Sequence, residues 1–145
     1  MKIYVATSWR NTDQPHVVRT LRYDGYEVYD FRNPVPGDHG FSWSEIDKEW
    51  MKWTPEMYLR ALNHPLAKDG FSKDMEALNN CDAVVLLTPC GRSAHLKAGY
   101  AIGQKKFVVV LLRDVEPELM YKMFTARVTS LTELQETLDH FRKGM

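Results

Sequence analysis

The chain has 145 residues, 44% of them hydrophobic, and its 19 basic residues balance 19 acidic ones. This balance argues against a nucleic-acid-binding surface, and no apolar run approaches the ~20 residues that span a bilayer. We therefore expect one cytoplasmic domain that binds neither a nucleic-acid polymer nor a membrane, with its two cysteines, Cys81 and Cys90, reduced.

The first thirty residues alternate between strand and helix patterns. Residues 2–7 and 26–31 have the composition of β-strands. Between them Asp13 can cap a helix, Pro15 suits its first turn, and Gly25 can end it. This stretch predicts a β-α-β unit.

Residues 32–70 depart from that alternation. They are rich in Pro, Gly, Asp and His and contain three of the four tryptophans. Apolar residues at spacings of 3, 4 and 3 predict a helix, and a Thr-Pro pair then predicts the start of another: Trp43, Ile46, Trp50, Trp53, Thr54 and Pro55. We expect a helical, Trp-rich insertion that forms a lid or arm.

The second half returns to the α/β alternation. The runs 83–87 and 107–112 are typical of parallel strands buried on both faces. Ser93 can cap a helix that runs to Gly103. A capping box begins the last predicted helix, with Ser130 and Glu133 as its two side chains.

Together these elements predict one α/β domain over residues 1–145, with the insertion at about 32–70. Its sheet is expected to have five mostly parallel strands and to be doubly wound, of the Rossmann-like or flavodoxin-like type. In such a sheet, ligands bind beyond the carboxyl ends of the strands, so the loops that follow the strands are the candidate sites.

Three such loops carry groups suited to a polar ligand. The first, 7–11, offers a hydroxyl, an indole and a guanidinium, although a plain polar turn explains it equally well. The second, 89–95, leads into a helix start, where free N–H groups favour an anion. The third, 33–43, has aromatic faces that can hold a flat base. The candidate binding residues are Ser8, Trp9, Arg10, Gly91, Ser93, His95, His39 and Trp43.

Several common sites are missing from the sequence. The five histidines are far apart and form no HxH or HxxxH pair, so we expect no metal. Neither GxGxxG nor GxxxxGK[ST] occurs, and we expect no cofactor. Cys90 has a neighbour in His95, but no further partner marks this pair as a nucleophile site.

Three segments resemble a known family: residues 2–9, residues 71–75 followed by 81–85, and the stretch SAHLKAGYA at 93–101. Across nearly its whole length the chain resembles the nucleoside 2-deoxyribosyltransferase-like superfamily, which includes the nucleotide N-glycosidases. In that family a glutamate attacks the anomeric carbon of a nucleoside or nucleotide and releases the base, and water or a second base completes the turnover.

By this resemblance, Asp74 contacts the sugar hydroxyls or assists protonation of the base, and Tyr4 orients the nucleophile. The position of the nucleophile itself, however, is Lys97. An ammonium cannot stabilise a developing cation, so N-glycosidase or transferase activity should be weak or absent. A further acidic residue of the family is also missing, because Gly91 and Arg92 occupy its stretch.

The lysine has several explanations, which the sequence leaves open. Lys97 is an introduced substitution, or it belongs to a chain that only binds its ligand, or another group performs the chemistry, or it is a solvated residue without a role. Three arginines, Arg10, Arg32 and Arg92, can face the anionic end of a ligand such as a 5′-phosphate, or be ordinary surface charges.

Two other functions compete with an impaired nucleoside or nucleotide N-glycosidase. One is a Toll/interleukin-receptor-like domain that cleaves NAD, and the other is a non-catalytic nucleotide sensor. The resemblance also implies a homodimer or higher homo-oligomer, because in related chains the C-terminal segment of one subunit often completes a neighbour's site. By this resemblance residues 118–121 lie near a ligand or an interface, and their Met and Tyr suit a dimer contact, although packing within one subunit also explains them.

Overall fold

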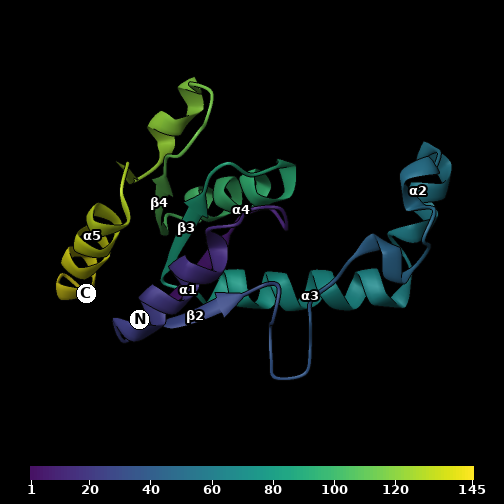
Figure 1. Cartoon of the computed structure of the whole chain (residues 1–145), viewed down its shortest axis with the longest axis horizontal. Helices are drawn as coiled ribbons and strands as arrows, with labels where there is room; N and C mark the ends of the chain where they lie inside the picture. The colour runs from purple at the N-terminus through teal and green to yellow at the C-terminus, as the bar shows by residue number, and fades with distance from the viewer. The chain divides into compact units, whose positions relative to one another are not determined.

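The computed structural model describes residues 1–145 (Figure 1). In chain order its elements are β1 (Lys2–Ala6), α1 (Gln14–Tyr23), β2 (Glu27–Asp30), the 3-10 turns η1 (Trp43–Glu45) and η2 (Trp50–Lys52), α2 (Pro55–Ala61), α3 (Pro65–Asn80), β3 (Ala83–Leu87), α4 (Arg92–Gly103), β4 (Phe107–Leu111), η3 (Leu119–Met123), β5 (Ala126–Val128) and α5 (Leu131–Lys143). None of the helices is both long and apolar enough to cross a membrane.

The chain forms two compact units. We call Met1–Asp30 together with Leu78–Met145 the sheet unit, and Phe31–Ala77 the insertion unit. The sheet unit contains all five strands, whereas the insertion unit contains η1, η2, α2 and most of α3.

The sheet unit is built on a wholly parallel five-stranded sheet with the order β2-β1-β3-β4-β5. This confirms the predicted fold class. The four strands expected from apolar runs lie within one residue of their predicted ends. The fifth strand, β5, has only three residues, too few for an alternation pattern to stand out in the sequence.

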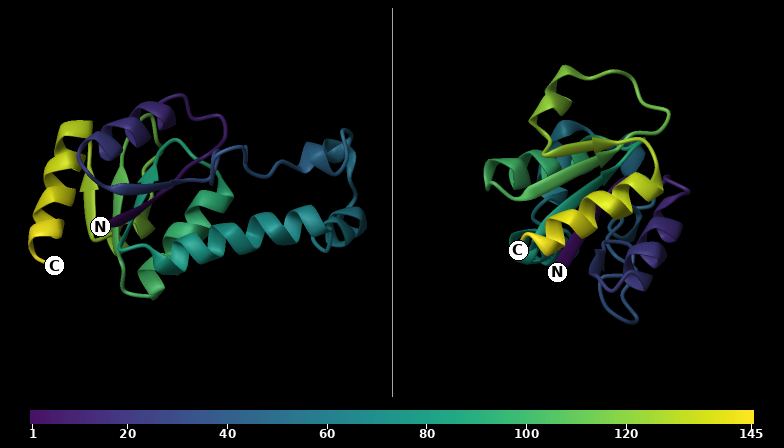
Figure 2. Two further views of the ribbon diagram at one scale, coloured as in Figure 1. Left: turned by 90° about the horizontal axis from the view of Figure 1, so that it is seen from below. Right: turned by 90° about the vertical axis from the view of Figure 1, so that its left-hand side faces the viewer.

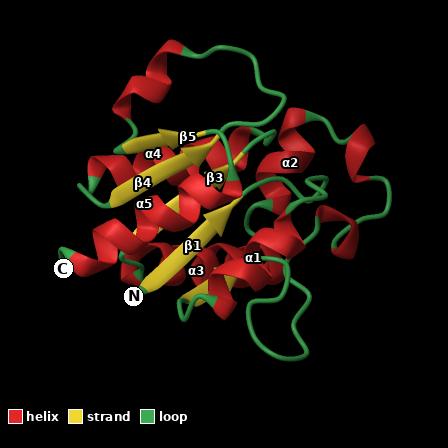
Figure 3. Ribbon diagram, turned by 60° about the vertical axis from the view of Figure 1, so that its left-hand side comes forward, coloured by secondary structure: helices red, strands yellow, loops and turns green.

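Helices cover both faces of the sheet (Figure 3). On one face, the side chains of α1 and α5 pack against alternate residues of the strands and form the main core, which includes Leu21, Val85, Val109, Leu134 and Leu138. Figure 2 shows α5 running along the strands, with the two chain termini close to each other. The opposite face is covered by α4 through three buried alanines, Ala94, Ala98 and Ala101.

The helix caps are partly those predicted. Ser130 Oγ accepts a hydrogen bond from the Glu133 N–H at 3.1 Å, which confirms the cap of α5. Asp13 occupies the N-cap position of α1 but makes no side-chain cap bond. The Asn11 side chain does so instead, because its Oδ1 accepts from the N–H groups of Asp13 and Gln14. The predicted cap at Ser93 is wrong, because the N-cap residue is Gly91 and α4 begins at Arg92.

The helix predicted from the tryptophan spacing in the insertion unit is wrong. The expected helix over 43–53 is two separate 3-10 turns. Trp43 packs edge-on against Phe41, Trp53 and Tyr58, so these rings contact one another rather than a helix groove. The predicted helix start at Thr54 is confirmed by the bond from the Met57 N–H to Thr54 Oγ1 at 3.3 Å.

Candidate functional site

The strand order reverses between β1 and β3. From β1 the chain passes to β2 on one side, and β3, β4 and β5 follow on the other side. At such a reversal the loops that leave two neighbouring strands turn away from each other, which leaves a binding crevice at their carboxyl ends. Here the two loops are residues 7–13, after β1, and residues 88–91, after β3.

Hydrogen bonds hold these two loops together. Ser8 Oγ accepts from the Gly91 N–H at 2.7 Å, and Asn11 Nδ2 donates to the Pro89 carbonyl at 3.2 Å. Below them, Thr7 Oγ1 donates to the Leu87 carbonyl at 2.7 Å. The two loops predicted as binding sites, after the first and third strands, therefore form one wall of the candidate site.

A buried polar network supports that wall. Asn11 is 6% exposed and bonds to both the start of α1 and the loop after β3. Gln14, 1% exposed, donates through Nε2 to Asp30 Oδ1 at 2.7 Å, at the end of β2. Buried amides and carboxylates are kept only where they are bonded, so this network fixes the ends of three strands relative to one another.

Lys97 lies over the ring of Tyr4. Tyr4 points to the face of the sheet that α4 covers, and it is fully buried. Its ring stacks on Tyr29 of the neighbouring strand, with centroids 4.9 Å apart. Half-buried on α4, Lys97 places its Nζ 5.4 Å from the Tyr4 ring centroid, which is cation–π distance. Two of the three predicted catalytic residues are thus neighbours.

His95 connects the start of α4 to η3. Its Nδ1 lies 2.8 Å from the Gly91 carbonyl, which can only accept, so Nδ1 carries the hydrogen. Its Nε2 then accepts from the Tyr121 hydroxyl at 2.8 Å. Burial raises the pKa of Tyr121, which keeps this phenol a donor. No pattern in the sequence predicts this contact, because 26 residues separate its partners.

Cys90 is not an activated thiol. Its Sγ lies 3.8 Å from His95 Nδ1, but the hydrogen on that nitrogen is already directed to the Gly91 carbonyl. Burial raises the pKa of Cys90 to about 11, so the thiol is protonated at neutral pH. Both cysteines are free, as expected.

The remaining candidates of the sheet unit are more exposed. Trp9 is 49% exposed, and Arg10 follows it on the same loop. Arg92 and Ser93 are exposed in the first turn of α4. All four are on the two loops or at the helix start next to them, and all can be reached by a solute.

Four predicted residues are in the insertion unit. The Arg32 guanidinium lies 5.9 Å from the centroid of the Phe31 ring. His39 is exposed on a loop, Trp43 belongs to the aromatic cluster described above, and Asp74 is half-buried on α3. Their participation in a site with Lys97 and Tyr4 stays a prediction.

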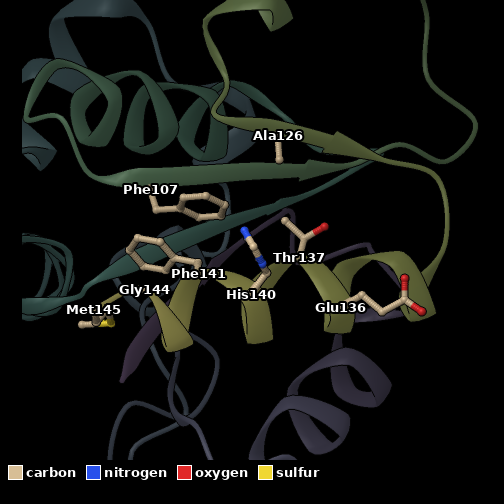
Figure 4. A pocket seen from close by; sticks show the side chains of 8 residues that line it. All are labelled: Phe107, Ala126, Glu136, Thr137, His140, Phe141, Gly144 and Met145. Atoms are coloured by element: carbon tan, nitrogen blue, oxygen red, sulfur yellow. The ribbon is translucent and has the colours of Figure 1, made fainter.

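A hollow of the sheet unit lies at the amino ends of β4 and β5, opposite to the candidate site. It has a volume of about 620 Å³ and is lined by the first residues of β4 and β5, Phe107 and Ala126, and by α5. In Figure 4 the Phe141 ring faces Phe107, and His140 rises from α5 toward the strands. Because ligands of parallel sheets bind at carboxyl ends, we do not assign the site here. No cluster of three or more metal-ligating side chains occurs in the chain.

The strand order defines the class of fold: a doubly wound, wholly parallel α/β domain, a fold in which ligands bind at the strand-order reversal. The fold is similar to that of a 2-deoxyribosyltransferase from Bacillus psychrosaccharolyticus, with a TM-score of 0.62 and 17% identity over 93% of this chain and 90% of that one. It is also similar to the CMP N-glycosidase BcmB of Clostridium botulinum, with a TM-score of 0.54 and 14% identity over 96% and 99%.

No family model and no curated protein matches the sequence. At these identities the two structures show a shared fold. The resemblance inferred from the three sequence segments is confirmed at that level.

Proposed function

We propose that the chain binds a nucleoside or nucleoside 5′-monophosphate in the crevice between β1 and β3. We further propose that cleavage of the N-glycosidic bond, or transfer of the deoxyribosyl group, is impaired there by Lys97. The support is the shared fold with a 2-deoxyribosyltransferase and a CMP N-glycosidase, together with the joined loops at the strand-order reversal.

The observation that carries this proposal is the position of Lys97. Its Nζ lies over Tyr4, on the helix that follows the loop of Gly91. This is where the resemblance assigns the nucleophile and the tyrosine that orients it. A side chain at this position faces the sugar in the proposed mode of binding.

A cation at this position opposes glycosyl transfer. The transition state for base release carries positive charge on the sugar ring. Two unit charges 4 Å apart interact by about 4 kcal/mol at an effective dielectric constant of ~20. Replacing the attraction of a carboxylate by the repulsion of an ammonium therefore slows the reaction by several orders of magnitude.

The start of α4 suits the anionic end of a nucleotide. The N–H groups of the first helical turn have no partner within the helix, and Gly91 supplies no side-chain cap. Arg92 is exposed in this first turn, and Arg10 is exposed on the facing loop. A 5′-phosphate can accept from the helix N–H groups and from these guanidinium groups.

The insertion unit supplies the other candidates. By the resemblance, Asp74 would contact the sugar hydroxyls or help to protonate the base. Trp43 and His39 would lie against the base, and Arg32 would bind the phosphate. These roles are part of the proposal.

Base release by the Lys97→Glu variant tests the catalytic part. Wild type, Lys97→Glu and Lys105→Glu are incubated with nucleosides, nucleoside 5′-monophosphates and NAD, and the free base is measured by chromatography. Lys105 is an exposed lysine in the turn after α4, so Lys105→Glu matches the charge change away from the site.

We expect Lys97→Glu to release base at least about 100-fold faster than the other two proteins, because it restores the carboxylate. No base release from any substrate by Lys97→Glu would contradict the catalytic proposal. Release of nicotinamide from NAD, in the same assay, would point to the competing NAD-cleaving function.

A binding function without turnover is the second candidate. It is favoured by the half-buried ammonium of Lys97, which can pair with an anion on the ligand. Calorimetric titration with nucleoside 5′-monophosphates should then show binding that Lys97→Ala weakens and Lys105→Ala does not. Equal affinity in wild type and Lys97→Ala would exclude this role for the lysine.

A further inference from the structure

A series of hydrogen bonds connects η3 to the start of α4. The Tyr121 hydroxyl donates to His95 Nε2 at 2.8 Å, and His95 Nδ1 donates to the Gly91 carbonyl at 2.8 Å. On the other side of the same residue, the Gly91 N–H donates to Ser8 Oγ at 2.7 Å. The wall of the candidate site is therefore joined, through the His95 ring, to a segment that comes much later in the chain.

The Tyr121 end of this series is held by the sheet. Tyr121 is 8% exposed, and its ring packs edge-on against that of Phe124, which is 6% exposed. From β5, Arg127 Nη1 donates to the carbonyls of both residues, at 3.1 and 3.0 Å. Because η3 is anchored to β5 in this way, the Tyr121 hydroxyl has a fixed position from which it bonds to the His95 ring.

Helix α4 has its packing and its first helical bond without the ring of His95. Three alanines with 2% exposure or less pack this helix against the sheet: Ala94, Ala98 and Ala101. The Gly91 carbonyl already accepts the first helical hydrogen bond, from the His95 N–H at 3.3 Å. The bond from the ring is a second one to the same oxygen, so what it adds is orientation.

This second bond fixes the direction of an N–H group at the helix start. In a trans peptide, the C=O of one residue and the N–H of the next point in opposite directions. Holding the Gly91 carbonyl therefore also holds the N–H of Arg92. That N–H belongs to the first turn of α4, where N–H groups have no acceptor within the helix and favour an anion.

We propose that His95 and Tyr121 are positioning residues of the candidate site. The Tyr121 hydroxyl holds the His95 ring, and the ring holds the peptide between Gly91 and Arg92 with its N–H directed at the anionic end of the ligand. This inference rests on the proposed function, in which a 5′-phosphate lies at the start of α4. In this role both side chains act on the recognition of the phosphate and leave that of the base and sugar unchanged.

Replacing Tyr121 by phenylalanine tests this role, because Tyr121→Phe removes the hydroxyl and keeps the buried ring. Tyr100→Phe is the matched control. The Tyr100 hydroxyl, near the other end of α4, donates to Asn79 Oδ1 at 2.7 Å, so this variant also loses one hydrogen bond of the helix. His95→Ala removes the ring, whereas His95→Asn keeps an N–H donor in place of Nδ1. The melting temperature checks that each variant is folded.

The first measurement needs no ligand. NMR of the ring nitrogens should show His95 with its hydrogen on Nδ1 in wild type and in Tyr100→Phe, and a changed Nε2 signal in Tyr121→Phe. The Arg92 amide signal should shift in Tyr121→Phe but not in Tyr100→Phe. Unchanged His95 ring and Arg92 amide signals in Tyr121→Phe would overturn the inference.

The second measurement is calorimetric titration with a nucleoside 5′-monophosphate and with the same nucleoside without its phosphate. We expect Tyr121→Phe and His95→Ala to weaken binding of the monophosphate by about 10-fold, which corresponds to one hydrogen bond to a charged group, and binding of the nucleoside by less than about twofold. His95→Asn should keep most of the wild-type affinity for the monophosphate, and Tyr100→Phe all of it.

The two ligands separate a positioning role from a merely structural one. Equal losses of affinity for both ligands, or no loss for either, would overturn the inference while the wild type still binds. A wild type that binds neither ligand would overturn the proposed function, and this role with it. If Tyr121→Phe does not fold, the comparison of His95→Ala with His95→Asn decides.

Discussion

The sheet unit and the insertion unit differ in how far they bury their apolar side chains. In the sheet unit, all residues of β3 and four of the five in β4 are buried, between α1 and α5 on one face and α4 on the other. In the insertion unit, α2 has one buried residue, Ala61, and the aromatic rings pack on one another in turns. The comparison teaches that the sheet unit has an extensive apolar core of its own, whereas the insertion unit buries few apolar side chains.

The largest difference should follow from removing the same two methyl groups in each unit. Val109 is fully buried in the core, and Val35 is 55% exposed in the insertion unit. Val109→Ala should lower the free energy of unfolding by roughly 2–3 kcal/mol, through lost burial and the cavity left behind. Val35→Ala should change it by less than about 0.5 kcal/mol. Urea denaturation measures the free energy of unfolding of both variants. Equal losses would contradict the proposed difference between the two units.

The buried hydrogen-bond network of Asn11, Gln14 and Asp30 should contribute nearly as much to the stability of the sheet unit as a core side chain does. Asn11→Ala removes the bond to the Pro89 carbonyl and the cap of α1. We expect the free energy of unfolding to fall by about 2 kcal/mol, since buried hydrogen-bond partners are left unpaired. Asn11→Asp keeps the oxygen that caps α1, so it should lower the free energy of unfolding by less than Asn11→Ala does. If both variants unfold at the same urea concentration as wild type, the loops are not held by this side chain.

Two helix N-caps, one in each unit, test the same difference in stability. Ser130 caps α5, which covers the core, and Thr54 caps α2. Ser130→Ala should lower the free energy of unfolding by about 1 kcal/mol. Thr54→Ala should change it by only a few tenths of a kcal/mol, because local fraying of α2 uncovers little buried surface. A larger loss for Thr54→Ala, measured by the same denaturation, would show that α2 is part of the cooperative core.

The smallest effect concerns the acid dependence of the insertion unit. The hydrogen bond from Lys73, aided by the Gly40 N–H, lowers the pKa of Asp38. Because the pKa is lower in the folded chain, this contribution is present above the ordinary value of about 4 and is lost as the pH falls through the lowered pKa. Lys73→Met should raise the pKa of Asp38 toward its ordinary value in a carboxyl NMR titration.

The matched group in the sheet unit is Asp139, whose pKa is lowered by Lys143 and Arg142 on the same helix. Lys73→Met should leave the pKa of Asp139 unchanged. An unchanged pKa of Asp38 in that variant would mean that the ion pair with Lys73 does not form in solution.

The sequence predicted most of the sheet unit, because its signals are local. The runs of β-branched residues at 83–87 and 107–111 give strands, and the Ser130 cap gives α5. The same kind of reasoning failed where side chains pack outside regular elements. The spacing of Trp43, Ile46, Trp50 and Trp53 matches a helix, but ring-on-ring contacts favour two turns.

The site could be predicted only in part. Residues on loops after strands were found, since parallel strands bring those loops to one edge. The stacking of Tyr29 on Tyr4 depends on strand register, and the bond of Tyr121 to His95 depends on how η3 folds back. Neither contact leaves a pattern in the sequence. The choice of Asn11 rather than Asp13 as the cap of α1 also requires the backbone path.

Backbone amide NMR during titration with a nucleoside 5′-monophosphate tests the central claim most directly, because it locates the ligand on the sheet. We expect the amide signals of Ser8, Gly91 and Lys97, at the carboxyl ends of β1 and β3, to shift with a saturable dependence on ligand concentration. Shifts confined to Phe107, Thr137 and Phe141, around the hollow at the opposite strand ends, or no shifts for any nucleotide, would contradict the proposed site.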